Sequence, residues 1–434
     1  MRALLVVPDY VSHWNPLSAV AAALTGRGHD VVVATGPALG PRVEADGFAH
    51  VQLRLGAGSN PGVSRSVRNA ELDGFFAATH AGMVATLRYQ AERRRHDLLW
   101  EPQAVAERVR EVIEDVAPDA TLVDQLAFGA TAALRGLRVP FVSFLPGHPC
   151  QLPARGETFG YPTLRPPSFT APEDELASLA ELCRHVTLAF TAAYNAAVSA
   201  LDPEADALED AFAAGGTAGT LVNYPEHLGG YAARRPQVGF VGSCIRAEQD
   251  DSPLAGLDRG MREQPRAYVS LGSFLSARTD VLRSVADALR MLGWDAVIAT
   301  GATDPADLGP APSSWVLAEH IPQIAALQSC DLVVCHGGNN TVTEALTAGL
   351  PLLALPFSTD QFAGAEDVRR GGLGDAAVPG VASAAEIASR LTALLEGPAA
   401  SEAEAFGRGL RSANGAERVA DAVERVGAGV ALLR

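Results

Sequence analysis

Residues 330–349 read CDLVVCHGGNNTVTEALTAG, and this stretch combines a strand, a polar turn and the start of a helix. Residues 331–335 form the apolar, β-branched run that is typical of a strand buried in a parallel sheet. Two glycines follow His336 and allow a tight turn, and three polar residues then stand where a helix begins. Free N–H groups and the helix dipole attract anions at such an end. The stretch therefore predicts an α/β protein with a phosphate-binding turn.

The same residues also allow an interpretation that needs no ligand. Asn340 could simply cap the helix. Thr341 and Glu344 fit the capping box, in which two side chains satisfy the first free N–H groups of a helix. On these residues alone both interpretations stay open.

Length, charge and cysteine content limit the class of protein. A chain of 434 residues exceeds a single core, so two domains are expected. A net charge of -16 would repel nucleic acid and anionic membranes, and neither is expected as a partner. Five cysteines without a C-x-x-C pair predict a reduced, cytoplasmic protein without a zinc site. The apolar runs are too short for a signal peptide or a membrane span.

The chain opens with a predicted βαβ unit. Residues 3–7 form a buried strand, Asn15 is the expected N-cap of a helix with Pro16 at its first position, and residues 30–35 form the next strand. His13 is therefore expected in the loop after the first strand. Open α/β sheets bind their ligands at that end of the strands.

Asp124 is the second candidate in this half of the chain. Residues 119–123 form another short buried strand, and a helix from about 127 to 134 follows it. Because parallel strands end at the same edge of a sheet, Asp124 should lie near His13. Asp124 could equally cap the helix that follows.

Prolines and turn residues indicate how the chain is divided. Residues 146–167 contain six prolines and predict a semi-rigid loop over the cleft. Residues 56–66, which match a dinucleotide fingerprint only weakly, predict a flexible loop. The expected division is a first domain at 1–224, a linker at 225–236, a second domain at 237–415, and a last helix at about 416–434 that packs back on the first domain.

The second half repeats the alternation of strands and helices. A strand begins it at 237–243, and another at 266–272 ends at Gly272 and Ser273, where the serine could cap a helix or face a phosphate. Pro322 fixes a turn between Ile321 and Gln323. Asp360 and Gln361 come after the strand that follows the glycine turn.

The spacing HGGNNTVTE followed by PFSTDQ resembles the donor-binding motif of inverting nucleotide-sugar glycosyltransferases with the GT-B fold. The chain is similar to the bacterial UDP-glycosyltransferases of natural-product pathways, the macrolide or antibiotic type, over nearly its whole length and most specifically at about 315–375. The resemblance implies two Rossmann-like, doubly wound parallel-sheet domains that face each other across a cleft. The first would bind the acceptor and the second the nucleotide-sugar donor.

The resemblance also implies roles for single residues. His13 would be the general base and Asp124 its carboxylate partner. The implied donor contacts are Gly272 and Ser273 with Gly338, Asn339, Asn340, Thr341 and His336 at the phosphates, Ile321 and Gln323 at the base, Glu344 at the ribose, and Asp360 and Gln361 at the sugar.

Three positions depart from the family pattern, because Ser12 and Asn340 stand where glycine is usual and Gly364 stands where asparagine is frequent. Aromatic residues near the catalytic loop and the proline-rich loop suggest a hydrophobic acceptor, although the same rings could belong to the core. The predicted acceptor-binding residues are Tyr10, Trp14, Phe144, His148 and Tyr161, with His148 the next base to test after His13.

The predicted reaction is the inverting, metal-independent transfer of a sugar from a UDP- or dTDP-linked donor to a hydroxyl of a small molecule such as a polyketide. No cofactor is expected, and the protein is expected to be a monomer or a homodimer. Two alternatives remain at this point: a nucleotide-sugar epimerase on the same fold, and a non-catalytic protein that binds sugar nucleotides.

Overall fold

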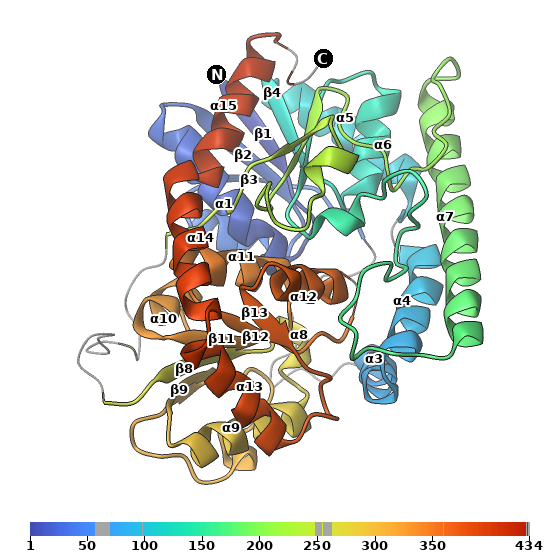
Figure 1. Ribbon diagram of the computed structural model, residues 1–434. Coiled ribbons are helices and arrows are strands. Elements are labelled where there is room, and N and C mark those ends of the chain that lie inside the picture. Colours follow the sequence, from blue (N-terminus) through green and yellow to red (C-terminus); the bar gives the residue numbers. More distant parts are fainter. Residues whose placement is uncertain are drawn as a thin grey trace.

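The computed structural model describes residues 1–56, 70–97, 99–247, 254, 263–358, 360–430 and 432. These residues form two parallel sheets with helices on both faces, one above the other in Figure 1. The predicted α/β class and the two doubly wound GT-B domains are thereby confirmed. All but the first residue of the loop predicted at 56–66 lie outside the described residues.

The first sheet has seven parallel strands. In spatial order they are β3 (Ala49–Gln52), β2 (Asp30–Thr35), β1 (Arg2–Val6), β4 (Ala120–Asp124), β5 (Val142–Leu145), β6 (Gly219–Val222) and β7 (Val238–Phe240). Its helices are α1 (Val11–Gly26), α2 (Gly40–Ala45), α3 (Ala70–Ala81), α4 (Met83–Asp97), α5 (Pro102–Val116), α6 (Phe128–Gly136) and α7 (Glu173–Leu201), with 3-10 turns η1 (Pro149–Gln151) and η2 (Ala232–Arg234).

The second sheet has six parallel strands. In spatial order they are β10 (Val316–Ala318), β9 (Asp295–Ala299), β8 (Arg266–Ser270), β11 (Leu332–Cys335), β12 (Leu352–Ala354) and β13 (Gly374–Ala376). The helices that follow or cover it are α8 (Gly272–Leu275), α9 (Thr279–Leu292), η3 (Pro305–Leu308), α10 (Gln323–Ser329), α11 (Asn339–Ala348), α12 (Gln361–Arg370), α13 (Ala384–Glu396) and α14 (Ala399–Ala413).

Each sheet has one point where the strand order reverses. The reversal falls between β1 and β4 in the first sheet and between β8 and β11 in the second. Every residue of β4, β8 and β11 is buried, as expected for strands covered on both faces. Ligands of open α/β sheets bind outside the carboxyl ends of the strands at such reversals. The topology thus marks two places for a site before any side chain is considered.

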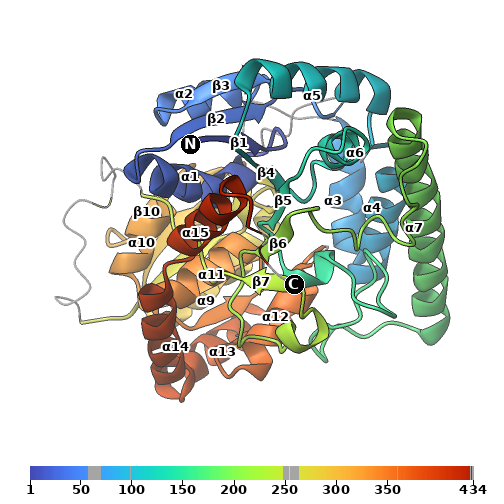
Figure 2. The same cartoon turned by 90° about the horizontal axis from the view of Figure 1, so that it is seen from above.

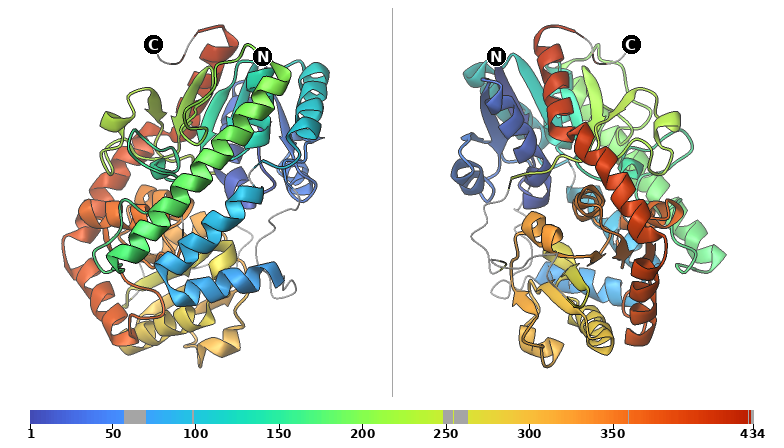
Figure 3. Two further views of the ribbon diagram at one scale, coloured as in Figure 1. Left: turned by 90° about the vertical axis from the view of Figure 1, so that its right-hand side faces the viewer. Right: turned by 60° about the vertical axis from the view of Figure 1, so that its left-hand side comes forward.

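The last helix, α15 (Gly415–Gly427), leaves the second domain and packs on α1 of the first. Figure 2 shows the two helices side by side, and Figure 3 (right) shows α14 and α15 as one bent path along the molecule. The bend is at Asn414, whose φ of 41° is left-handed. Arg27, which follows α1 directly, forms ion pairs with Glu417 and Glu424, and Val419 of α15 is buried in the core of the first domain.

Some helices of the first domain also lie beside the second domain. In Figure 3 (left), α3, α4 and the lower part of α7 lie beside the second domain. Arg278, at the start of α9, donates a hydrogen bond of 3.2 Å to Thr79 of α3. The Phe169 and Phe362 rings meet edge to face, with centroids 5.2 Å apart. The two domains therefore touch well away from the cleft as well as across it.

One sequence expectation about the chain division is wrong. Residues 237–243 were expected to open the second domain, but β7 pairs with β6 in the first sheet, with Val222 opposite Phe240. Residues 225–236 accordingly form the crossover between these two strands, and the connection between domains comes after Phe240. The apolar pattern predicts a strand here, but no local pattern specifies which sheet a strand joins.

Candidate active site

The first cluster of functional side chains lies where β1 and β4 end. These strands are neighbours, with Val6 opposite Val123, so the residues that follow them share one sheet edge. His13 Nδ1 lies 2.8 Å from Asp124 Oδ2, and the other oxygen of Asp124 accepts the Leu126 N–H. Asp124 is completely buried, whereas the His13 side chain is 16% exposed and lines the cleft. The carboxylate thus holds the imidazole from behind and leaves Nε2 toward the cleft.

Helix α1 begins earlier than expected, so His13 is in its first turn and not in a loop. The helix begins at Val11, with Tyr10 at the N-cap position and no side-chain cap. The expected cap, Asn15, is therefore wrong, and Pro16 lies inside the helix. Proline has no N–H, so Pro16 cannot donate to the carbonyl of Ser12 four residues before it.

The carbonyl of Ser12 finds its donor in the other domain. Asn340 of α11 donates from Nδ2 to Ser12 O at 2.6 Å. Ser12 and Asn340 are the two positions where glycine was expected from the family pattern. A side chain of α11 is therefore bonded to the residue beside His13, and this bond joins the two domains across the cleft.

The glycine turn after β11 has the form that the sequence predicted. Gly337 has a φ of 81° and Gly272, after β8, has a φ of 72°, both in the left-handed region that favours glycine. A Cβ at Gly272 or Gly338 would overlap the ring of His336. The absence of side chains at these positions lets the histidine ring lie between the two strand ends, beside the N-terminus of α11.

His336 is neutral at pH 7. Burial lowers its pKa to about 4, although Asp360 and a hydrogen bond with the backbone of Ser270 act in the opposite direction. His336 Nδ1 and Asn339 Oδ1 are both buried, and neither has a hydrogen-bond partner among the described residues. Both atoms lie at the first turn of α11, so the polar groups here are not satisfied by the protein alone.

The capping interpretation of α11 is not supported by the geometry. Gly338 is the N-cap residue, and it has no side chain with which to cap. Thr341 Oγ1 lies 3.4 Å from Gln323 Oε1. Glu344, which the capping box would turn back toward the N-terminus, bonds to other side chains. The first turn of α11 thus keeps its N–H groups for the cleft.

Glu344 is bonded to two side chains that line the cleft, Gln323 and Arg246. Its carboxylate is 4% exposed, accepts a hydrogen bond from Gln323 Nε2, and pairs with Arg246 Nη1 at 2.7 Å. Arg246 lines the same cleft. No sequence pattern indicates Arg246, because it belongs to no motif and lies in the connection after β7.

Of the two residues predicted to contact a sugar, Asp360 lines the cleft and Gln361 supports the chain below it. Asp360 precedes α12, and its Oδ2 accepts the backbone N–H of His148 at 3.0 Å. Gln361 is buried, and its side-chain oxygen accepts the backbone N–H groups of Phe357 and Ser358. The Gln361 oxygen thus holds the loop before Asp360, which differs from the predicted role.

Three of the five predicted acceptor residues are buried away from the cleft. Trp14 donates to Asp46 and packs on Phe48, and Phe144 is a completely buried part of β5. His148 is 1% exposed. These three predictions are wrong in this structure, and the reason is the one left open by the sequence: large rings next to strand ends are also the preferred filling of a core.

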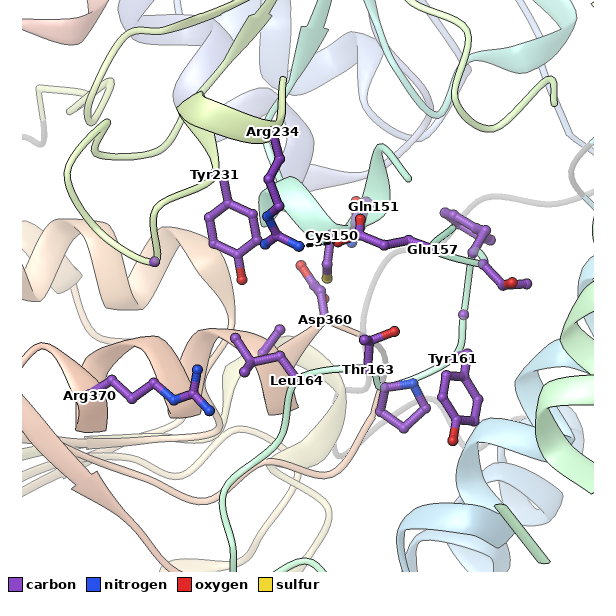
Figure 4. Close-up of a pocket in the computed structure, with 16 residues that line it drawn as sticks. Cys150, Gln151, Glu157, Tyr161, Thr163, Leu164, Tyr231, Arg234, Asp360 and Arg370 are labelled. Carbon is purple, nitrogen blue, oxygen red and sulfur yellow. Dashed lines mark hydrogen bonds and ion pairs between the residues drawn. The ribbon is translucent and has the colours of Figure 1, made fainter. Parts of the chain in front are cut away.

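The other two acceptor candidates have some exposure. The ring centroids of Tyr10 and His13 are 5.4 Å apart. Tyr161 lines a second cavity of about 320 Å³ between the proline-rich loop and α12, shown in Figure 4. Asp360 and Gln151 line both this cavity and the main cleft. The second cavity therefore adjoins the cleft at the end where Asp360 stands.

The main cleft, of about 470 Å³, receives residues from both domains. It contains most of the predicted donor residues: Gly272, Ile321, Gln323, His336, Gly338, Asn339, Asn340, Thr341 and Asp360. Glu344 lies behind them, in contact with Arg246 and Gln323. The backbone of Ser273 is in α8, but its side chain lies outside the described part of the chain.

Comparison with known proteins agrees with this arrangement. Residues 235–403 match the family described as "UDP-glucoronosyl and UDP-glucosyl transferase". The matched residues take in most of the second domain. The match covers the glycine turn, α11 and Asp360, all of which contribute residues to the cleft.

Individual relatives resemble parts of the chain. The NDP-glycosyltransferase YjiC of Bacillus licheniformis is 28% identical over 43% of this chain and 47% of its own. The oleandomycin glycosyltransferase of Streptomyces antibioticus is 32% identical over 34% of each. The chain thus spans about half the length, or less, of these relatives. The glycosyltransferase VinC, solved in complex with dTDP, has the same fold over 99% of this chain, with a TM-score of 0.65 and 19% identity.

The described residues contain neither a candidate membrane span nor a cluster of metal-ligating side chains. None of the helices there, including the 29-residue α7, is long and apolar enough to cross a membrane. Within the same residues, no three His, Cys, Asp or Glu side chains are grouped as metal ligands would be. None of the five cysteines forms a disulfide.

Proposed function

We propose that this protein is an inverting glycosyltransferase that moves a sugar from a nucleoside-diphosphate donor to a hydroxyl of a hydrophobic small molecule, such as a polyketide or another secondary metabolite. One observation carries the proposal. A single cleft is lined by His13, with Asp124 bonded behind it, from one domain and by an open helix N-terminus from the other. The first can remove a proton from an acceptor, and the second can bind a diphosphate.

His13 would act as the general base. An alcohol is a weak nucleophile, and transfer of its proton to Nε2 as the new bond forms makes attack on the anomeric carbon possible. The buried Asp124 carboxylate on Nδ1 fixes the tautomer and stabilises the imidazolium that results. Attack from the side opposite the leaving group would invert the anomeric configuration.

The leaving diphosphate would be stabilised by the first turn of α11. Its negative charge grows as the glycosidic bond breaks, and N–H groups at a helix N-terminus oppose that charge without rearranging. Asn339 and Thr341, both in that turn, line the cleft. His336 enters as a neutral ring and would gain a proton or donate a hydrogen bond when phosphate is bound.

The nucleoside would lie toward Glu344 and Gln323, and the sugar toward Asp360. Glu344 can accept a hydrogen bond from a ribose or a deoxyribose hydroxyl, and its pairing with Arg246 holds it in place. Both UDP and dTDP donors therefore suit the site. The dTDP complex of VinC and the antibiotic acceptor named for the oleandomycin relative favour donors and acceptors of natural-product pathways.

Metal-independent catalysis is part of the proposal, because the helix end and His336 provide the groups that oppose the diphosphate charge. Of the alternatives, a nucleotide-sugar epimerase would need no acceptor base, and the His13–Asp124 pair in the cleft argues against it. A purely binding protein would likewise have no use for that pair.

The proposal is tested by incubating the protein with UDP- and dTDP-linked hexoses and a panel of hydrophobic alcohols and phenols. Mass spectrometry should detect an acceptor heavier by one sugar, and NMR should show the anomeric configuration opposite to that of the donor. Conversion of the donor sugar in the absence of any acceptor would support an epimerase instead. Nucleotide binding without any product across the panel would favour the binding protein.

A further inference from the structure

A buried carboxylate with three donors lies directly behind the sugar end of the cleft. Asp367 of α12 is 1% exposed. Its Oδ2 lies 2.7 Å from the Tyr224 hydroxyl and 2.9 Å from His148 Nε2, and its Oδ1 lies 3.4 Å from the Tyr231 hydroxyl. Taking a carboxylate out of water is costly, and such a group persists when it is fully hydrogen-bonded.

The donors to Asp367 come from the other domain. Tyr224 follows β6, Tyr231 is in the crossover before β7, and His148 follows β5 in the proline-rich loop. The two tyrosine rings stand edge to face against the imidazole, with centroids 4.8 and 5.1 Å away. Burial, with the nearby Asp367, raises the pKa of both tyrosines, so they remain donors.

The hydrogen bonds of His148 define its tautomer. Nδ1 accepts the backbone N–H of Cys150 at 3.2 Å, so the ring proton is on Nε2 and points at Asp367. With both ring nitrogens bonded, the ring is held at the start of the 3-10 turn η1. The backbone at His148 is thereby held as well.

That backbone is bonded to the candidate sugar-binding residue. The His148 N–H donates to Asp360 Oδ2 at 3.0 Å. Asp360 and Asp367 are seven residues apart at α12, and such a spacing brings them to the same face of the helix. One residue of the first domain thus contacts both carboxylates, Asp367 through its ring and Asp360 through its backbone. Figure 4 shows Asp360 facing the second cavity, below Cys150, which belongs to the same proline-rich loop as His148.

We propose that Asp367 and His148 are positioning residues for the transferred sugar: they hold the His148 N–H against the Asp360 carboxylate and so orient that carboxylate from the opposite domain. This inference rests on the proposed function, in which Asp360 meets the sugar. The sequence suggested that His148 contacts the acceptor or serves as a reserve base. The positioning role replaces both, because the buried ring does not line the cleft. Recognition of the sugar, unlike that of the nucleotide, then requires the contact between domains at this edge.

The test separates binding of the sugar from binding of the nucleotide. Calorimetry gives the dissociation constants of two pairs of ligands, UDP with UDP-glucose and dTDP with dTDP-glucose. In each pair, the ratio of the two dissociation constants measures the contribution of the sugar to affinity. Asp367→Asn and His148→Phe should each leave the constant for the diphosphate unchanged and reduce the sugar's contribution by roughly tenfold, the effect of weakening one hydrogen bond to a charged group. His148→Gln, which can still donate to Asp367, should recover part of the loss.

Because the two residues act in series, the double variant Asp367→Asn with His148→Phe should be no worse than either single one. The matched control is Tyr194→Phe, which removes another buried tyrosine hydrogen bond, to Thr131, at residues that line neither the cleft nor the second cavity. It should lower the melting temperature and leave the ratio unchanged. If Asp367→Asn is poorly folded, Tyr224→Phe weakens the same cluster with a smaller change.

The outcomes distinguish the inference from the function. An unchanged ratio in Asp367→Asn and Tyr224→Phe, with only a lower melting temperature, would make the cluster a structural feature and overturn the inference. Equal losses for the diphosphate and its glucose conjugate would overturn it too, since a positioning effect is confined to the sugar. A wild-type protein that binds none of the four nucleotides would instead reject the proposed function.

Discussion

Replacing the members of the His13–Asp124 pair one at a time and together tests whether they act as a unit. A positioned general base contributes about 10² to 10⁴ in rate, so His13→Ala should lower turnover by that factor. Asp124→Asn keeps the shape of the side chain and removes its charge. Since Asp124 is fully buried and 2.8 Å from Nδ1, the lost bond is one to a charged group, about 1.5–3 kcal/mol or roughly 10- to 150-fold.

The double variant decides between a unit and two independent residues. Asp124 acts only through the imidazole, so removing both side chains should cost little more than His13→Ala alone. The assay is steady-state kinetics on the four proteins, with calorimetry of the nucleotide as a check that the donor site is intact. His29→Ala is the matched control, because His29 is paired with Glu424 at 2.7 Å, between α1 and α15 and away from the cleft. Near-normal turnover in His13→Ala, or losses that multiply in the double variant, would refute the mechanism.

Four further predictions concern groups around the cleft. Turnover should survive an excess of EDTA, and a loss that magnesium restores would contradict a charge balance made by α11 and His336 alone. Because the pKa of His336 is about 4 in the free protein and a diphosphate should raise it, nucleotide binding at pH 5.5 should take up protons, measured by calorimetry in two buffers of different ionisation enthalpy. In the free protein the same lowered pKa means that the folded state binds fewer protons than the unfolded one, so stability should fall as pH drops from about 6.5 to 4, by at most about 3 kcal/mol, and a flat denaturation profile there would contradict it. Asn340→Ala should lower the free energy of unfolding by about 0.5–1.5 kcal/mol, and less in a Pro16→Ala background, where α1 supplies its own donor to the Ser12 carbonyl; equal losses in both backgrounds would show that this bond is not the cause.

The parts of the site that sequence patterns predicted are those fixed by backbone geometry. The turn at 336–338 needs glycine for its φ angles and for the space beside the His336 ring, and glycine in that position is visible in a sequence. His13 and Asp124 follow strands, and parallel strands end at a common edge, so their proximity could also be foreseen. No such argument exists for side chains whose partners come from the other domain.

Asp367 and Arg246 illustrate what local patterns leave out. Each occupies a position with no motif around it, and each gains its importance from partners about 100 or more residues away in the sequence. Trp14 and Phe144 show the converse, since rings near the strand ends proved to be core. Gln361 has the predicted sequence position, but its side-chain oxygen is bonded to the backbone of the preceding loop. Periodicity predicts which face of an element is buried, and it does not predict what that face meets.

The return of α15 to the first domain has a consequence for protein synthesis and for engineering. Ala416, Val419, Ala420 and Val423 complete a core whose other members begin at residue 3. The ribosome therefore synthesises the whole second-domain sheet before α15, which completes the core of the first domain. The first domain can reach its final packing only when nearly the entire chain has been made. For the same reason, a hybrid that takes its second domain from a relative needs two junctions, one after β7 and one at Asn414, if the first domain is to keep its own final helix.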